Sequence, residues 1–505
     1  MGKGLEKKKS AAYDKGVRAR RVALVVAATV LLLAQVWVAL LFVRQGLDAL
    51  AFPYPLNYGE GPLLDQAVRL AEFQNIYRSD LATPPYVISN YPPLFPLAQA
   101  PFVWLFGPAL WYGRLISLLS AAAVALFVGL TLHALTRDRL AALSGALIFP
   151  AIPYVVRWAS LARVDLLGLA FSWAGLFVVV RWPDKRWSIA FAGLLLVAAV
   201  YTRQTYALAA PFAAFVWLLA QGQKRRALEL AGFAGGSALI LFATLNTLTG
   251  GGFFLNTVIA NLNDFRWERV SLNALGALLA CPLLLFGALA FLLLAPRKSN
   301  RSWWLVAPYL LASVPSALLV GKVGSDVNYL LELSAALGLA TGAVISWQRQ
   351  RPRVRTLLII LLAVQVVALA QSSRVPSGLQ DYAIEQRAEV RQLSSIVAEA
   401  KGPVLTDDQM GLLPLNGRRI YLQPFEMTQL SRARPRAWDQ RPLVRAIEEK
   451  RFPVIMMWKP PFAREINRDR WTPEMLKAIR ARYEPTEDLA DMVIYRPKEP
   501  EEQRP

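Results

Sequence analysis

The chain has 505 residues, 55% of them hydrophobic, and a mean hydropathy of +0.35. This is too apolar for a soluble globular protein, in which about 45–50% of residues are apolar. The net charge is +21, but the part after Ser373 is nearly balanced, with 23 basic and 20 acidic residues. The excess belongs to the apolar part, where it is typical of membrane topology and argues against a nucleic-acid partner.

Apolar runs long enough to cross roughly 30 Å of hydrocarbon recur from Val22 to Ala370. The first follows a basic leader, residues 1–21, and shows no small-residue cleavage site, so we expect an uncleaved span. Hydropathy predicts about eleven spans. Their approximate limits are 22–43, 108–135, 140–157, 164–180, 188–202, 206–220, 227–247, 271–295, 302–320, 329–346 and 356–371.

The connections between these spans carry a topology signal. Alternate connections are rich in Arg and Lys, which predicts that they and the N-terminus are cytoplasmic. An odd number of spans then places the C-terminal part outside a plasma membrane, the inner membrane of a bacterium. Most acidic residues before Ser373 fall on or near this outer face: Asp48, Glu60, Asp65, Glu72, Asp80, Asp165, Asp264, Glu268, Asp326 and Glu332.

The first outer loop, residues 44–106, is the longest of these connections, and loops of this length are usually functional. It contains two short amphipathic pieces, "GPLLDQAVRLAEF" and "YPPLFPLAQAPFVWLFG", with a proline-rich turn between them. The second piece is apolar but too short to span, so we expect it to lie in the membrane interface or to re-enter the bilayer.

The pattern changes after the last span. Residues 373–505 read as a small soluble α/β domain, with helices predicted over 382–400, 438–452 and 472–483 and strands over 403–408, 453–458 and 491–497. The predicted fold is therefore an all-α polytopic membrane domain, residues 22–372, followed by an α/β extracytoplasmic domain.

Glu60 is the first candidate for chemistry. It lies in "NYGEGP", where the flanking glycines permit close approach of another molecule and Pro62 suits a helix start. Tyr58 lies beside it as a candidate substrate contact. The competing interpretation is a helix-start acid that complements the helix dipole.

Asp165 is the second candidate carboxylate, at the outer end of the fourth predicted span in "ARVDLLGLAFSWAGL". Carboxylates that enter an apolar helix are often functional. A helix cap, or an ion pair with Arg163, would explain it equally well.

Two outer cations, Arg203 in "YTRQTYA" and Lys322 in "GKVGSDVNYLLE", run against the positive-inside bias. Guanidinium and ammonium groups bind phosphate, so a phosphate ligand is one interpretation. Contact with lipid headgroups, or pairing with an acid such as Glu332, is the other. Asn328 and Tyr329 precede Glu332, and these three residues together with Arg163 join the candidate substrate contacts. The sequence has no Cys/His spacing typical of a metal site.

Together these motifs resemble the GT-C superfamily of membrane glycosyltransferases, in the branch with protein O-mannosyltransferases, aminoarabinose transferases and bacterial RgtA/B/C/D-like enzymes. The resemblance covers roughly residues 20–370 and rests on "NYGEGPLLDQAVRLAEFQNIYR", "YPPLFPL", "ARVDLLGLAFSWAGL", "YTRQTYALAAP" and "GKVGSDVNYLLE". The family motif in the first loop usually reads Asp-Glu-Gly. Here it reads Gly59-Glu60-Gly61, so the usual aspartate is missing. Tyr91 and Pro92 fall where the family has its loop Tyr-Pro.

The resemblance implies an outward-facing site that moves a sugar from a polyprenyl-phosphate donor to an extracytoplasmic glycan, lipid or protein. Glu60 would be the base, contributing about 10²–10⁴-fold, and Asp165 would assist it. Arg203 and Lys322 would stabilise the departing phosphate. We expect inversion at the anomeric carbon and no obligatory cofactor, and a divalent cation stays open. A polyprenyl-diphosphate-dependent ligase or polymerase and a lipid or solute transporter are the alternatives.

Overall fold

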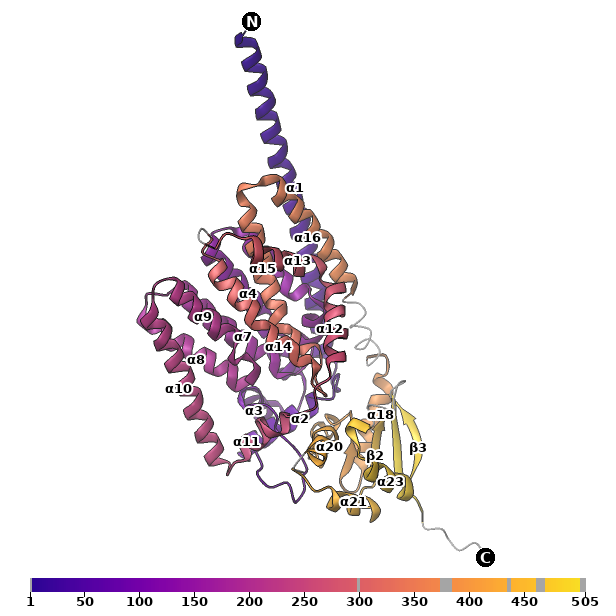
Figure 1. Cartoon of the computed structure of the whole chain (residues 1–505). Coiled ribbons are helices and arrows are strands. Elements are labelled where there is room, and N and C mark those ends of the chain that lie inside the picture. Colours follow the sequence, from indigo (N-terminus) through magenta and orange to yellow (C-terminus); the bar gives the residue numbers. More distant parts are fainter. Residues whose placement is uncertain (1, 298–299, 373–383, 434–436, 460–467, 500–505) are drawn as a thin grey trace, which may run out of the picture.

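The computed structural model describes residues 2–297, 300–372, 384–433, 437–459 and 468–499. A helical bundle makes up most of the molecule, and a smaller α/β domain lies against one end of it (Figure 1). The N-terminal part of helix α1 projects from the opposite end of the bundle. The predicted combination of an all-α membrane domain with an α/β C-terminal domain is confirmed.

The helices of the bundle follow the apolar runs of the sequence and pack around large buried side chains such as Trp173 and Trp217. Their bounds are α1 Gly2–Ala51, α4 Trp111–Thr136, α5 Arg139–Ile148, α6 Pro153–Ala159, α7 Val164–Arg181, α8 Arg186–Thr202, α9 Ala209–Ala220, α10 Lys224–Leu248, α12 Trp267–Ala280, α13 Pro282–Leu294, α14 Trp303–Leu318, α15 Leu331–Trp347 and α16 Pro352–Ser372.

The helices at the predicted spans differ in length. Within the described residues, seven helices are long and apolar enough to cross a membrane, or up to nine if two bent pairs each count as one span. The pair α5–α6 bends by 65° and the pair α12–α13 by 96°, and prolines at both breaks remove helix hydrogen bonds. The other two predicted spans are α8 and α9, of 17 and 12 residues. At 1.5 Å per residue both are shorter than the hydrocarbon layer.

The basic connections lie together at one end of the bundle. Arg355 Nη2 is 2.7 Å from Asp138 Oδ2, which joins the connection after α15 to the one after α4. Arg226, in the first turn of α10, donates to the carbonyl of Pro183, after α7, at 2.6 Å. This clustering agrees with the predicted alternation of charge. Which side of a membrane this end faces stays a prediction.

The first outer loop contains α2, Glu60–Ala71, and α3, Leu94–Phe106, and the short helix α11, Gly252–Thr257, lies nearby. Helix α3 exposes Leu97, Trp104, Leu105 and Phe106, as expected for a helix in the membrane interface. Helix α2 is buried on nearly all sides. Its polar face, with Asp65 and Arg69 paired at 2.7 Å, is covered by the C-terminal domain, whose Ile420 N–H donates to Asp65.

The C-terminal domain is a four-stranded sheet with helices packed around it. The strands are β1 Val404–Thr406, β2 Val454–Trp458, β3 Tyr483–Leu489 and β4 Met492–Pro497, in the order β1-β2-β4-β3. Only β1 and β2 are parallel. The helices are α18 Arg387–Glu399, α19 Leu412–Leu415, α20 Pro424–Arg432, α21 Arg441–Glu448 and α23 Pro473–Arg482. The predicted helix over 382–400 begins partly outside the described residues.

Main-chain hydrogen bonds dock this domain onto the first outer loop. Tyr86 N donates to Tyr421 O at 2.7 Å and Gln423 N donates to Tyr86 O at 2.9 Å, which forms a short parallel β-bridge. The Gln423 side chain then accepts a bond from Ile88 N at 2.8 Å. The residue after Gln423 begins helix α20, so the start of α20 has a fixed position against the loop.

Candidate functional site

A cavity of about 350 Å³ lies between the end of the bundle and the C-terminal domain. The first outer loop, the turns before α7 and α15, the segment before α12 and the C-terminal domain all contribute to its wall. Polar and aromatic residues of the wall include Asn57, Tyr58, Tyr91, Trp158, Arg163, Arg269, Lys322, Asp326, Asn328, Tyr329, Phe425, Glu426, Trp458, Asp469 and Arg470.

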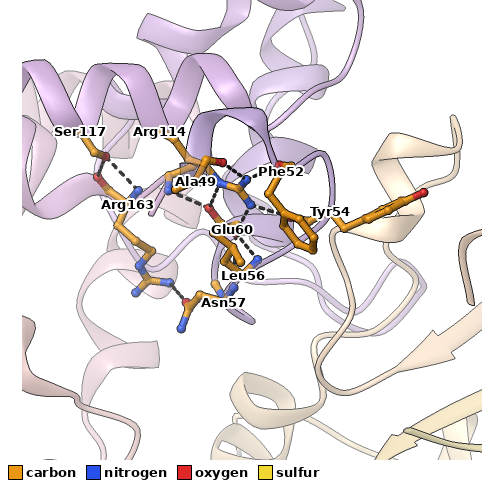
Figure 2. Close-up of polar contacts among 11 residues, drawn as sticks. Ala49, Phe52, Tyr54, Leu56, Asn57, Glu60, Arg114, Ser117 and Arg163 are labelled. Carbon is orange, nitrogen blue, oxygen red and sulfur yellow. Dashed lines mark hydrogen bonds and ion pairs between the residues drawn. The ribbon is translucent and has the colours of Figure 1, made fainter. Parts of the chain in front are cut away.

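Glu60 is completely buried and does not line the cavity. Arg114 of α4 donates to both of its carboxylate oxygens, at 2.8 and 2.9 Å, and the N–H groups of Leu56, Asn57 and Ala162 donate to them as well (Figure 2). The remaining Arg114 donors bond the carbonyls of Ala49, Phe52 and Tyr54. A carboxylate has about four lone-pair sites, so none is left to accept a substrate proton.

The electrostatics of Glu60 point the same way. Burial opposes its ionisation, but the charge and hydrogen bonds of Arg114 outweigh this and lower the pKa of Glu60. A carboxylate with a lowered pKa is a weak base. A general base needs an acceptor site that is open to the substrate, and this geometry has none. Glu60 instead joins the first outer loop to α4 and to the turn before α7.

Gly59 allows this arrangement. A Cβ atom at Gly59 would lie 1.3 Å from Nη1 of Arg163, so the Arg163 side chain fills the space where a side chain at position 59 would lie. The glycine therefore permits close approach of a residue of this chain, and the backbone at Gly59 is in the ordinary α region.

Asp165 lies one layer behind the cavity wall, in the first turn of α7, and is fully buried. It accepts hydrogen bonds from Trp158 Nε1 at 2.7 Å and from Asn328 Nδ2 at 2.9 Å. Both donors belong to residues of the wall. The arrangement suits a residue that orients Trp158 and Asn328.

Arg203 is also buried behind the wall, at 1% exposure, and pairs with Asp165. Its guanidinium carbon lies 4.4 Å from the ring centroid of Tyr329, within the range of a cation–π contact. Glu332 is 1% exposed in the first turn of α15 and does not reach the wall either. The cavity wall therefore lacks four of the charged residues that the sequence singles out: Glu60, Asp165, Arg203 and Glu332.

The cations that do line the cavity are Arg163, Arg269, Lys322 and Arg470. Lys322 is partly exposed and has no carboxylate partner among the residues that the structure describes. Arg163 contacts Tyr91 Oη at 3.4 Å and Asn57 Oδ1 at 3.5 Å. These long contacts leave Arg163 able to bond an anionic ligand more closely.

Aromatic side chains form much of the remaining wall. Tyr91 is held by its carbonyl, which accepts a bond from Tyr77 Oη at 2.9 Å, and Trp158 is held by Asp165. Tyr58 and Tyr329 complete the group. Rings with fixed positions beside polar groups suit a sugar, which has apolar faces and hydroxyl edges. Tyr58, Tyr91, Arg163, Asn328 and Tyr329, all predicted from the sequence, are brought together here.

The contribution of the C-terminal domain could not be predicted. Arg470 pairs with Asp408 at 3.1 Å and lies over the rings of Trp458 and Tyr58, at 4.6 and 5.4 Å from their centroids. Phe425 packs against Gly324, which has a positive φ of 82°. Glu426 accepts a hydrogen bond from the Tyr58 hydroxyl. The only local signal is the helix start at Pro424, and nothing in it indicates which surface the helix faces.

No group of three or more His, Cys, Asp or Glu side chains in the described part of the chain could hold a metal ion. The wall carboxylates Asp326 and Asp469 lie near Arg157 and Arg432, at 3.3 and 3.7 Å.

No protein-family model and no curated protein sequence matches the chain, but several solved structures are similar to it. ArnT from Cupriavidus metallidurans bound to undecaprenyl phosphate has a TM-score of 0.61 and 13% identity, over 91% of this chain and 97% of that one. The oligosaccharyltransferase AglB from Archaeoglobus fulgidus, in complex with an inhibitory peptide and a dolichol-phosphate, has a TM-score of 0.51 and 11% identity, over 92% of this chain and 74% of that one. Both are GT-C proteins. The chain has the GT-C fold, as the sequence motifs predicted.

Proposed function

We propose that this chain with the GT-C fold is an integral membrane glycosyltransferase that moves a sugar from a polyprenyl-phosphate donor to an extracytoplasmic acceptor. The observation that carries the proposal is the cavity between bundle and C-terminal domain, in which cations and aromatic rings surround a space of about 350 Å³. A sugar phosphate needs both kinds of contact, and the solved structures of this fold described above contain polyprenyl phosphates.

Lys322 and Arg163 are the cations that we assign to the donor phosphate. Lys322 has no carboxylate partner in the described residues, and Arg163 makes only long contacts. Charge-assisted bonds to the phosphate would stabilise it as it departs, in a site partly shielded from water. Arg203, by contrast, is proposed as a positioning residue that holds Asp165 and Tyr329.

Helix α12 supports a path for the lipid tail. None of its residues is buried, and it exposes Trp267, Leu272, Leu275 and Leu279. In its first turn Arg269 lines the cavity and donates to Ser325 O at 2.6 Å. A polyprenyl chain lying along α12 would bring its phosphate to Arg269 and Lys322. Figure 1 shows α12 at the side of the bundle, on the way to the C-terminal domain.

The reaction proposed for this site is a single displacement with inversion. The acceptor hydroxyl attacks the anomeric carbon as the bond to phosphate oxygen breaks, and the wall cations hold the resulting phosphate. Asp165 orients Trp158 and Asn328 in this scheme, and Glu60 fixes the loop that carries Tyr58. Neither touches the reacting atoms.

The lipid that copurifies with the full-length protein tests the proposal. We expect native mass spectrometry of the protein in nanodiscs to show bound polyprenyl monophosphate, and added undecaprenyl phosphate to bind with saturation. Recovery of a polyprenyl diphosphate would instead indicate a ligase or polymerase. Protein that binds neither lipid would contradict the proposed function.

A further inference from the structure

Glu426 belongs to the C-terminal domain, yet it lies in the wall of the cavity. It is in the first turn of α20, which begins at Pro424 directly after Gln423. Both the backbone and the side chain of Gln423 are bonded to the first outer loop, through Tyr86 and Ile88. The position of Glu426 in the cavity wall therefore depends on the docking of the C-terminal domain onto the first outer loop.

The two carboxylate oxygens of Glu426 have different surroundings. Oε1 accepts a hydrogen bond from the Tyr58 hydroxyl. Oε2 is buried and has no hydrogen-bond partner among the described residues. Leaving a buried acceptor unpaired costs about 1–3 kcal/mol, and more for a charged group, so such an atom in a native structure calls for an explanation. A hydroxyl of a bound ligand would supply the missing donor.

The other carboxylates of the wall are less buried. Asp326 accepts from Arg157 and from its own neighbour Val327 N, and its side chain is 39% exposed. Asp469 lies 3.7 Å from Arg432, and its side chain is 27% exposed. Among the described wall residues, Glu426 is thus the carboxylate that has a buried oxygen without a hydrogen-bond partner.

The chemistry of the pair suits proton transfer. Burial raises the pKa of the Glu426 carboxyl above its usual range, although Tyr58 and nearby arginines oppose the shift. A raised pKa makes a carboxylate a stronger base, and the most effective base has a pKa close to the working pH. Burial and the charge of Glu426 also raise the pKa of Tyr58, which keeps its proton and remains a donor to Glu426.

We propose that Glu426 is the general base of the reaction, so that the C-terminal domain supplies a catalytic residue to the site at the end of the bundle. This inference rests on the proposed glycosyltransferase function. In the step, Oε2 takes the proton of the acceptor hydroxyl while the acceptor oxygen bonds to the anomeric carbon. The anomeric carbon–oxygen bond to the phosphate breaks with its electron pair, which leaves on the polyprenyl phosphate.

A purely structural role makes different predictions. A glutamate in the first turn complements the helix dipole, and its bond with Tyr58 joins the two domains. In that case removing the charge would loosen the docking and change lipid binding, thermal stability and turnover together. If Glu426 is the general base, removing its charge should change turnover and leave lipid binding and thermal stability unchanged.

The experiment uses the full-length protein in nanodiscs. Undecaprenyl-phosphate-linked hexoses and pentoses are supplied as donors, with water and then an extract of cell-envelope lipids and glycans as acceptors. Single-turnover release of undecaprenyl phosphate is followed for the wild type, Glu426→Gln and Glu426→Asp. Exposed Glu448 of α21 provides a matched control in the same domain, as Glu448→Gln.

We expect Glu426→Gln to slow release by about 10²–10⁴-fold, the range for a lost general base. Undecaprenyl phosphate affinity and hydrogen exchange of the Tyr86 and Ile88 amides should be unchanged, Glu426→Asp should recover part of the rate, and Glu448→Gln should behave as wild type. Normal release by Glu426→Gln, or equal loss of rate, binding and docking, overturns the inference and leaves the proposed function standing. A wild type that releases no undecaprenyl phosphate from any donor overturns both.

Discussion

Two buried glutamates of this molecule show how surroundings decide what a carboxylate can do. Glu60 accepts bonds from Arg114 and three backbone N–H groups, whereas Glu426 accepts one bond, from Tyr58. The pKa of Glu60 is lowered and that of Glu426 is raised. Carboxylates whose surroundings shift their pKa values in opposite directions have different roles in enzymes.

At the residue scale, we expect Glu60→Gln to act on stability. The substitution leaves the Arg114 charge fully buried without its partner, and breaking a buried pair typically costs about 3–5 kcal/mol. Thermal unfolding of the purified protein should therefore move down by several degrees. Glu72→Gln is the control, because the Glu72–Arg419 pair is partly exposed and such pairs contribute about 0–1 kcal/mol. A variant of normal stability that has lost turnover would return Glu60 to the role of base.

The pH dependence of turnover distinguishes the two carboxylates. A base must be ionised, so the rate should fall as the pH drops through its pKa. With Glu426 as base, the midpoint of this fall should lie above about 4.3, the value for an unperturbed glutamate. With Glu60 it would lie below that value. The measurement is kcat/KM between pH 4 and pH 9, and the fall should disappear in Glu426→Gln.

The prediction on donor binding concerns Lys322. Replacing it with Gln removes the cation that has no carboxylate partner in the described residues, and a hydrogen bond to a charged group contributes about 1.5–3 kcal/mol. Undecaprenyl phosphate should bind at least about tenfold more weakly. Lys477→Gln, an exposed position of α23, provides the control. Equal affinities of all three proteins would remove Lys322 from the phosphate site.

At the scale of elements, the contact between α2 and the C-terminal domain depends on close approach of two backbones. A Cβ atom at Gly61 would lie 2.3 Å from Gly411 N, and a backbone atom cannot move aside as a flexible side chain can. We therefore expect Gly61→Ala to loosen the docking.

The amides of Tyr86, Ile88 and Gln423, which bond across the two domains, report on this docking. They should exchange hydrogen faster in Gly61→Ala than in the wild type. Gly235→Ala is the control, because nothing lies within 4 Å of a Cβ there and alanine favours the helix. Unchanged exchange in Gly61→Ala would show that the docking does not depend on this contact.

Elements with a strong pattern could be predicted from the sequence, and those defined by contacts between domains could not. The apolar helices α4, α7 and α15 and the buried strands β1 and β2 lie where hydropathy indicates. Strand β3 was missed because its sequence, "YEPTEDL", is polar, as suits an edge strand that exposes its side chains.

The same distinction applies to the candidate site. The sequence indicates Tyr91 through the resemblance to the family's loop Tyr-Pro, and Lys322 through its outer position against the positive-inside bias. Glu60, Asp165 and Arg203 are also charges on the predicted outer face, but their partners, which are distant in sequence, place them behind the wall. Glu426 has an ordinary helix-start sequence, and only the docking of its domain brings it to the cavity.

At the scale of the whole molecule, the topology remains a prediction with a direct test. The N-terminal part of α1 and the C-terminal domain lie at opposite ends of the bundle, and the basic connections lie together. By the positive-inside rule, the residues after Ser373 should lie outside the cytoplasm. Alkaline phosphatase fused after Ser373 should therefore be active, and green fluorescent protein fused at the same site should not fluoresce. Fluorescence without phosphatase activity would place the cavity on the other side.

The wall of the cavity combines residues from Asn57 to Arg470, and this has a consequence for biosynthesis. The ribosome adds about 5–20 residues per second, so on the order of tens of seconds separate the synthesis of the first wall residue from that of the last. During that time the helices can insert into the membrane while the part of the cavity wall that the C-terminal domain supplies is still missing. On the proposed function, a nascent chain, or a product shortened by a premature stop codon, lacks part of the cavity wall and is expected to be inactive until nearly the whole polypeptide has been made and its last domain has docked onto the first loop.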